Sequence, residues 1–369
     1  MDNSASPDKL SFSSLNGRQL SPPKGHLTRT GARLLHLKGG SGGEPPVYVQ
    51  AYSTLDLPGL VDFLKGVDDK VASAVALCAK IWYHYKCEKG HEVYKPRLCR
   101  QRRFCPRDAE AYVKSRVAHA YEVFKRLEIV YGWRIYLIHI VFTLPKDLWI
   151  RVVENPDPFF EAVYEALKYE GGMSGGVASL HLIHSSRPLD GWYPHIHAIV
   201  PNVVLIRHRE INWIGGARVK ASYFKRTRPF FNESRLKERY RSSIKRVFGV
   251  EVEDVDVYVG YVRLRDKVKA KHRLRYAFRM PIQDLAPHLN GSLSNGVKEF
   301  VLKVLNYPYE RIRWFGWLAK GVVGRYLPGY VKLNEFLKEF EGRCPICCSP
   351  LRFVECLDRP PPLIVVSGV

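Results

Sequence analysis

The sequence predicts an α+β fold in which a central antiparallel sheet carries helices on one face. The strand candidates are rich in β-branched and aromatic residues: 134–144, 177–184, 193–203 and 255–262. Only the loop 185–192 separates the second and third of these, so two adjacent antiparallel strands are the simplest arrangement. The segments with helical apolar spacing are 60–85, 109–127, 157–169, 297–307 and 333–340.

Four regions follow from composition. The chain has 369 residues, 46% of them hydrophobic, which is ample for a core and for more than one domain of about 150 residues. Residues 1–50 are rich in Ser, Pro and Gly and are expected to be a disordered basic tail. Residues 51–130 are expected to be a helical zinc-binding segment, 131–290 a central α+β domain, and 291–369 a helical region with a Cys knuckle.

The charge of the chain favours a polyanionic partner. Lys and Arg total 58 against 36 Asp and Glu, which gives a net charge of +22. Such a balance points to nucleic acid or an anionic membrane and disfavours acidic substrates. No apolar run approaches the roughly 18 to 20 residues of a membrane span, and the start of the chain is polar. We therefore expect a cytoplasmic protein with no membrane partner.

Two histidines at alternate positions form a candidate metal site. His195 and His197 lie in one predicted strand, where residues two apart point to the same face, so both imidazoles can reach one ion. The preceding strand is expected to end at His184, which makes that residue the candidate third ligand. A solvated surface pair is the alternative interpretation. His139, His181 and His208 are expected to serve packing or the surface.

Cysteine spacing predicts structural zinc rather than disulfides, because no secretion signal is present. The first candidate set, within 19 residues, is Cys87, His91, Cys99 and Cys105. The second set is Cys344, Cys347 and Cys356, whose fourth ligand is Cys348, a residue from elsewhere, or absent. Cys78 lies in an apolar helical stripe and is expected in the core. Separate buried thiols are the alternative for the first set.

A regular charge pattern precedes residue 276. Cations occupy every second position: Arg263, Arg265, Lys267, Lys269, Lys271, Arg273 and Arg275. At this period they form one face of an extended strand, which predicts a row of contacts to a phosphate backbone. A solvated edge that resists aggregation is the alternative. The region 207–246 is also basic and carries interleaved aromatic residues that suit stacking on single-stranded bases.

The segment from Ser179 to His197 resembles the metal-binding motif of the HUH nucleases, which is histidine, a hydrophobic residue, then histidine. The strand that ends in 141–145 (Val-Phe-Thr-Leu-Pro) is similar to the first motif of that family. A histidine ahead of the pair, as in the transposase-like branch, supports His184. The resemblance implies that 131–290 is a nuclease domain with a divalent ion, Mg²⁺ or Mn²⁺, at His184, His195 and His197.

The same resemblance implies a tyrosine nucleophile. Segment 275–282 is similar to an Arg-Tyr-x-x-Arg-x-Pro-Ile segment of the transposase-like branch, which designates Tyr276; Tyr258 and Tyr261 are alternatives. Members with two tyrosines carry the first one four residues earlier, where this chain has His272, so a single-tyrosine mechanism is implied. Because a tyrosine has a pKa of about 10, cations must stabilise the phenolate. The nearby candidates are Arg273, Arg275 and Arg279.

The zinc segment carries a resemblance of its own. Residues 103–106 (Arg-Phe-Cys-Pro) are similar to an Arg-x-Cys-Pro element in related transposases. Where that family often has another Cys after Cys-Pro, this chain has Arg107 and Asp108. The fourth ligand is therefore either His91 or Asp108.

Together these patterns predict an enzyme that nicks and joins single-stranded DNA through a 5′-phosphotyrosine, most simply a rolling-circle replication initiator of a plasmid or virus. Its expected partners are single-stranded DNA or an origin hairpin, and a host helicase and polymerase, because no phosphate-binding loop for ATP is present. The alternatives are a transposase of the same superfamily and a zinc-stabilised nucleic-acid-binding regulator without catalysis.

Overall fold

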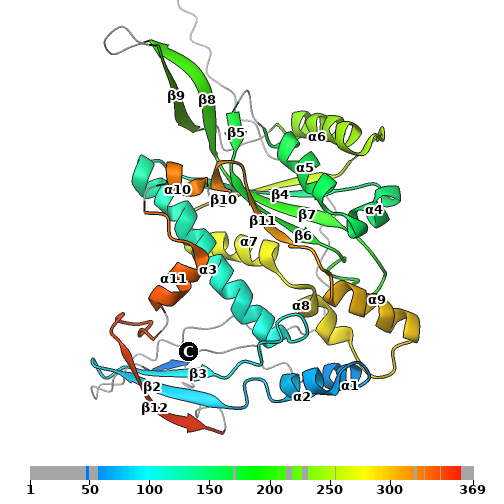
Figure 1. Ribbon diagram of the computed structural model, residues 1–369, viewed down its shortest axis with the longest axis vertical. Helices are drawn as coiled ribbons and strands as arrows, with labels where there is room; N and C mark the ends of the chain where they lie inside the picture. The colour runs from blue at the N-terminus through cyan, green and yellow to red at the C-terminus, as the bar shows by residue number, and fades with distance from the viewer. Residues whose placement is uncertain are drawn as a thin grey trace, which may run out of the picture.

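The protein is an α+β molecule that contains antiparallel sheets (Figure 1). The computed structural model describes residues 47–49, 57–168, 172–212, 218–226, 232–253, 255–319, 322–327, 329–340 and 342–358. The predicted tail, residues 1–50, lies outside the described residues except for strand β1 (Val47–Val49). None of the described helices is long and apolar enough to cross a membrane.

The central sheet has five strands, and every neighbouring pair is antiparallel. In spatial order they are β10 (Val257–Arg263), β4 (Tyr136–Thr143), β7 (His195–Pro201), β6 (Gly176–His181) and β11 (Ile312–Phe315). The four strands expected from sequence are thus confirmed, whereas β11 lies in a region expected to be helical. Strand β7 occupies the middle of the sheet, so both of its edges are paired and its side chains are held rigidly.

Helices cover both faces of this sheet, so the expectation of helices on one face was wrong. Helix α7 (Lys267–Phe278) packs against the face that carries the histidines, because the ring of Tyr276 lies 6.1 Å from that of His139. The opposite face is covered by α6 (Glu233–Phe248), whose Tyr240 ring lies 4.9 Å from Phe142. Residues 139 and 142 differ by an odd number along β4, so they point to opposite faces.

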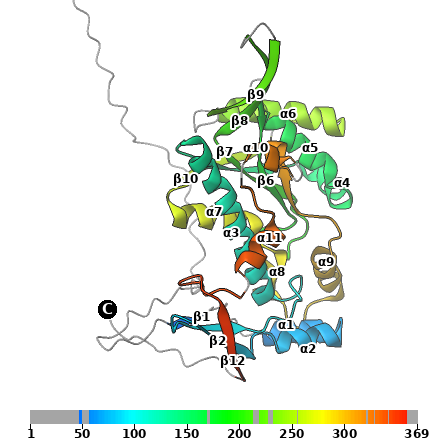
Figure 2. The ribbon, with the colours of Figure 1, turned by 60° about the vertical axis from the view of Figure 1, so that its left-hand side comes forward.

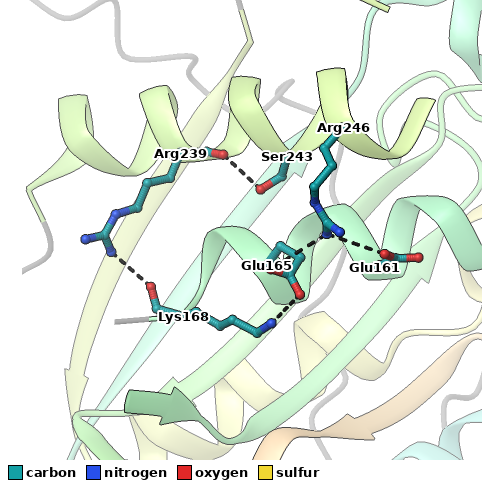
Figure 3. Close-up of polar contacts among 6 residues, drawn as sticks. All are labelled: Glu161, Glu165, Lys168, Arg239, Ser243 and Arg246. Carbon is teal, nitrogen blue, oxygen red and sulfur yellow. Dashed lines mark hydrogen bonds and ion pairs between the residues drawn. The ribbon is translucent and has the colours of Figure 1, made fainter. Parts of the chain in front are cut away.

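Helices α5 (Asp157–Ala166) and α6 pack side by side (Figure 3). Arg246 contacts the carboxylates of Glu161 and Glu165 at 3.4 and 3.6 Å. Arg239 donates to the backbone oxygen of Lys168 at 3.0 Å. These ion pairs are partly exposed and contribute only about 0 to 1 kcal/mol each. The pair is therefore held mainly by the buried residues of both helices, including Phe159 and Tyr240.

The long helix α3 (Pro106–Tyr131) connects the Cys-rich end of the molecule to the central sheet (Figure 1). Its limits follow from the sequence, because proline occupies its first turn and Gly132 ends it in the left-handed conformation, with φ of 64°. Buried residues such as Val113 and Phe124 join it to the main core. That core is continuous from Leu60 in α1 to Leu305 in α9.

The helices expected on either side of the Cys/His cluster are present, but the Cys-rich segment between them forms a sheet instead of continuing the first helix. After α1 (Pro58–Lys65) and α2 (Asp69–Ala76) the chain becomes extended. The four strands, in spatial order, are β1, β3 (Glu92–Pro96), β2 (Trp82–Cys87) and β12 (Leu351–Leu357). The aromatic sequence of β2 favours a strand over the helical continuation to residue 85. The C-terminal strand β12 pairs antiparallel with β2.

A third sheet projects from the molecule as an arm (Figures 1 and 2). It contains β5 (Gly172–Ser174), β8 (Val203–Asn212) and β9 (Arg218–Arg226). The remaining helices are α4 (Trp149–Glu154), α8 (Pro281–Leu285), α9 (Asn295–Leu305), α10 (Val323–Tyr326) and α11 (Leu333–Phe340). Much of the basic, aromatic-interleaved region 207–246 lies in β8, β9 and α6.

Gly316 offers a test of the close packing behind β6. Its φ is +61°, and a Cβ there would lie 1.7 Å from the carbonyl oxygen of Ser174. Gly316→Ala should therefore lower the free energy of unfolding by about 3 kcal/mol or more. The control is Gly296→Ala in α9, where a Cβ meets nothing within 4 Å and about 0.4 to 1 kcal/mol of stabilisation is expected. Urea unfolding followed by circular dichroism measures both, and equal midpoints would contradict the packing described here.

Candidate active site and metal centres

Three buried histidines converge at the centre of the sheet. His181 on β6 lies directly opposite His195 on β7, and His197 follows two residues later on the same face. The atoms that each can offer to a metal all lie within 4.8 Å of one another. The paired histidines expected from sequence are thus brought together, with a third imidazole beside them.

The third imidazole is His181, not His184 as expected. Strand β6 ends at His181, and His184 lies in the following loop, where its Nδ1 is 2.9 Å from the hydroxyl of Ser186. His184 lines the same cavity but is not part of the metal-binding group. The strand was expected to continue three residues too far. The missed signal is register, because the antiparallel pairing of β6 with β7 sets His181, and not His184, opposite His195.

Hydrogen bonds orient two of these rings for a cation. His195 Nδ1 donates to the carbonyl oxygen of Tyr193, and His181 Nε2 donates to that of Ala277, both at 2.8 Å. Each bond leaves the other ring nitrogen with its lone pair available. His197 Nε2 is buried and has no hydrogen-bond partner among the described residues. Three free lone pairs in a buried group are what a divalent metal ion requires.

The rings are also neutral, as metal ligands must be. Burial lowers the pKa of His195 to about 4 and holds the pKa of His181 and His197 well below the usual value of 6.5. Neutral imidazole retains the lone pair that binds a metal, whereas imidazolium does not. The donor set therefore fits a divalent cation.

A fourth histidine, His139, supports the group from β4. It was expected to serve packing or the surface, but its Nε2 lies 2.8 Å from Nδ1 of His197. Burial, with a contribution from the Arg273 charge, lowers the pKa of His139 to about 4, so this ring is neutral too. A proton on His197 Nδ1 can be donated to His139. That bond directs Nε2 of His197 into the cavity.

Tyr276 faces the histidines from α7. Its ring lies 5.1 Å from that of His197, and 36% of the residue is exposed. The guanidinium of Arg279 lies 4.9 Å from the ring centre of Tyr276. Tyr276 borders a cavity of about 540 Å³ that His195 and His197 also line. The hydrogen bond between His181 and the backbone of Ala277 fixes α7 against the sheet at the residue after the tyrosine.

The alternative tyrosines are placed differently. Tyr258 on β10 also lines the cavity and is 61% exposed, whereas Tyr261 does not line it. Tyr258 therefore remains a second hydroxyl within the site, although its ring shows no contact with the three-histidine group among the described residues. Tyr276 contacts the rings of His139, His181 and His197.

The three arginines expected near the nucleophile have separate roles. Arg273 lines the cavity, but Arg275 forms an ion pair with the buried Glu110 of α3 at 2.9 Å. Arg279 pairs with Asp284 at 3.0 Å, while its Nε and Nη2 have no hydrogen-bond partner. Burial raises the pKa of Asp284 to about 6 despite the adjacent Arg279. Arg273 and Arg279 are thus the cations beside the tyrosine.

The segment 263–275 is not an extended cationic face, as was expected. Arg263 ends β10, Arg265 follows it, and the residues from Lys267 onward form α7. Asp266 caps this helix by accepting from the backbone N–H of Lys269 at 3.1 Å. The decisive pattern is apolar: the buried positions Ala270, Leu274, Ala277 and Phe278 follow helical spacing. On a helix, alternate cations point in different directions, so they form no single row.

The first Cys cluster combines residues from the N-terminal and C-terminal parts of the described chain. Cys87 and His91, at the β2–β3 turn, meet the C-terminal knuckle of Cys344 and Cys347. His91 Nδ1 lies 3.2 Å from the sulfur of Cys347 and 3.6 Å from that of Cys344. The two sets expected to be separate are thus halves of one site. Cys356 is exposed on β12 and does not belong to it.

The second Cys cluster contains Cys78, Cys99 and Cys105. Cys78 was expected in the core, and Cys99 and Cys105 were expected to share a site with Cys87. An oxygen of Asp108 lies 3.9 Å from the sulfur of Cys99. Cys105 stands at the N-terminus of α3. Three sulfurs and a nearby carboxylate form a donor set suited to a metal ion.

Backbone conformation independently marks these cysteines. Among the described residues the non-glycine positions with positive φ are Ala79, Arg100 and Cys348, each near +60°. Each directly follows a cysteine of one of the two clusters. This conformation costs about 1 kcal/mol or more, so it persists where surrounding structure requires it. Both clusters therefore depend on specific loop geometry and are not accidental groupings of thiols.

Comparisons with known proteins do not assign this site, because no protein-family model, no curated protein and no solved structure matches the chain.

Substitution of the two competing histidines tests the cation site. His181→Ala removes a lone pair from the group, so Mn²⁺ binding should weaken by about 100-fold or more, beyond the effect typical of outer residues. His184→Ala is the matched control and should change Mn²⁺ affinity by less than about threefold. Titration by electron paramagnetic resonance measures free Mn²⁺ directly. The reverse order of effects would return His184 to the ligand set.

Proposed function

We propose that this protein is a metal-dependent enzyme of the HUH type that nicks and joins single-stranded DNA through a 5′-phosphotyrosine. The observation that carries the proposal is the position of Tyr276. Its ring lies 5.1 Å from His197, beside a buried group of three neutral histidines whose free lone pairs converge. A regulator that uses zinc only for stability has no need of a tyrosine and arginines at such a group.

The residues of the site would have separate roles in strand transfer. His181, His195 and His197 would hold a divalent ion, Mg²⁺ or Mn²⁺, and of these two, imidazole ligands favour Mn²⁺. A bound ion would supply positive charge beside the scissile phosphate. The Tyr276 hydroxyl loses its proton, and its oxygen attacks phosphorus. The bond from phosphorus to the 3′ oxygen breaks and that oxygen takes up a proton from water, which leaves a free 3′-OH and a 5′-phosphotyrosine. Arg279, over the ring, and Arg273, in the cavity, stabilise the phenolate.

The site remains open to a strand from solvent. The cavity of about 540 Å³ reaches the surface at Tyr276 and Tyr258, which are both exposed. The attack is reversible, because a 3′-OH held at the same place can displace Tyr276 and rejoin the strand. The 3′-OH can prime replication or enter transposition. A replication initiator is the simpler case, since the proposed mechanism uses a single tyrosine, and it requires a separate helicase.

We propose zinc as the ion of both Cys clusters. Thiolate and imidazole ligands in sets of three or four suit Zn²⁺. The site of Cys87, His91, Cys344 and Cys347 supplies a full tetrahedral set. The site of Cys78, Cys99 and Cys105 has three thiols, and Asp108 is the adjacent carboxylate.

A covalent adduct is the direct test of the proposed chemistry. Purified protein with Mn²⁺ and single-stranded oligonucleotides that cover its own replicon should give a protein–DNA band on a denaturing gel. Tyr276→Phe removes the attacking oxygen and should abolish the band, a loss of at least about 10³-fold. Tyr258→Phe, in the same cavity, is the matched control and should retain it.

The outcomes separate the alternatives. A band that survives Tyr276→Phe but disappears in Tyr258→Phe would move the nucleophile to β10. Salt-dependent binding with no band in the wild-type protein, when the origin sequence is among the oligonucleotides, would favour the non-catalytic regulator and contradict the proposal.

Metal content tests the composite zinc site. Cys344→Ser should remove one zinc ion per chain and release β12 from β2, because the knuckle is joined to Cys87 and His91 through that site. Cys356→Ser, an exposed cysteine on the same strand, should leave zinc content unchanged. Atomic emission on the purified variants measures the ions per chain. Equal zinc in both variants would contradict the shared site.

A further inference from the structure

A second cavity, away from the histidines, gathers positive charge. It has a volume of about 290 Å³ and lies between the N-terminal half of α3, the start of α8 and the chain entering β11. Its cationic lining residues are Arg102, Arg103, Arg116 and Arg311, with aromatic rings from Tyr112 and Tyr309. The proposed chemistry at Tyr276 uses none of these residues.

The lining of this cavity has four guanidiniums and one carboxylate, that of Glu310, so it carries excess positive charge. Nε of Arg116 is buried without a hydrogen-bond partner among the described residues. Burial lowers the pKa of Arg311 to about 10, and the Arg103 charge adds to that shift. A protein that brings like charges together in a half-buried cavity disfavours its own cations unless an anion is bound there.

The aromatic lining has the geometry of a stacking platform. The guanidiniums of Arg102 and Arg116 lie 4.5 and 5.0 Å from the ring centre of Tyr112. These contacts fix the direction of both cations around one ring. At the rim, Tyr309 is 41% exposed and packs at 5.4 Å against Tyr307. Cations for a phosphate and an exposed ring for a base are the two elements of single-strand recognition.

One short segment joins this cavity to the candidate active site. Arg279 lies over Tyr276, and the next two residues, Met280 and Pro281, line the arginine cavity. Arg311 donates to the sulfur of Met280 at 2.8 Å. From Tyr276 to Pro281 the chain spans at most about 18 Å even when fully extended. A strand attached at Tyr276 therefore reaches the second cavity within a few nucleotides.

We propose that the cavity formed by Arg102, Arg103, Arg116 and Arg311 binds a backbone phosphate of single-stranded DNA, with a neighbouring base stacked on Tyr309. The site anchors the strand beside the position of cleavage, and in this respect it rests on the proposed function. A DNA strand and a free nucleotide both carry a phosphate that these arginines could bind. A strand is the favoured occupant, because Tyr276 borders the active-site cavity and Met280 and Pro281, four and five residues later, border the arginine cavity.

The salt dependence of binding tests this site without catalysis. In a Tyr276→Phe background, fluorescence anisotropy measures the affinity for a labelled oligothymidylate at several salt concentrations. Arg102→Gln with Arg103→Gln removes two exposed cations, so the slope of log affinity against log salt should fall by about 1.4. Lys70→Gln with Lys80→Gln removes the same charge from exposed positions outside the cavity and should leave the slope unchanged.

A second variant and a stability control keep the result interpretable. Tyr309→Ala leaves every cation in place and should weaken oligothymidylate binding about tenfold through lost stacking. Zinc content and the unfolding midpoint of the arginine variant should match the wild type, because Arg102 and Arg103 lie between two cysteines of the second cluster. An unchanged slope in a correctly folded arginine variant would overturn the proposal.

Three further outcomes distinguish failure of the arginine-cavity proposal from failure of the proposed nicking activity. Competition by micromolar nucleoside monophosphate, with no change of slope for the oligonucleotide, would overturn the strand assignment in favour of a free nucleotide. Adduct formation at Tyr276 with an unchanged slope would overturn the second site alone. A reduced slope with no adduct in the wild-type protein would support the second site and contradict the proposed nicking activity.

Discussion

Strand register in the central sheet is the constraint on which the candidate active site depends. The pairing of β6 with β7 sets His181 directly opposite His195, and the pairing of β4 with β7 brings His139 to His197. A shift of one residue in either ladder would send one imidazole to the other face, where α5 and α6 pack. Because β7 is paired on both sides, the group is held by the most rigid part of the sheet.

The histidine group also determines where α7 lies. The carbonyl oxygen of Ala277 accepts a hydrogen bond from His181, and the residue before it is Tyr276. One hydrogen bond therefore orients the His181 ring and places Tyr276 beside the histidine group. Burial makes the histidines neutral, so the same packing sets both ring geometry and protonation state.

One Cys cluster brings together residues that lie far apart in the sequence. Cys87 on β2 and His91 lie in one candidate metal-binding group with Cys344 and Cys347. His91 and Cys347 are 256 residues apart in the sequence. This cluster, which could hold a metal ion, brings the N-terminal and C-terminal parts of the fold together where β12 pairs with β2. The small buried cluster around it contains only Cys87, Val93 and Cys344 among the described residues. The other Cys cluster anchors the start of α3.

Local pattern by itself determined much of this protein. The β-branched segments that became β4, β6, β7 and β10, the His195–His197 spacing, and the proline and glycine that bound α3 all act through neighbours in the chain. Tertiary structure alone decided which distant residues meet. His181 replaced His184, and Cys78 and Cys344 joined clusters that spacing had divided differently. Local spacing specifies which way a side chain points, but sheet register and chain closure decide what it meets.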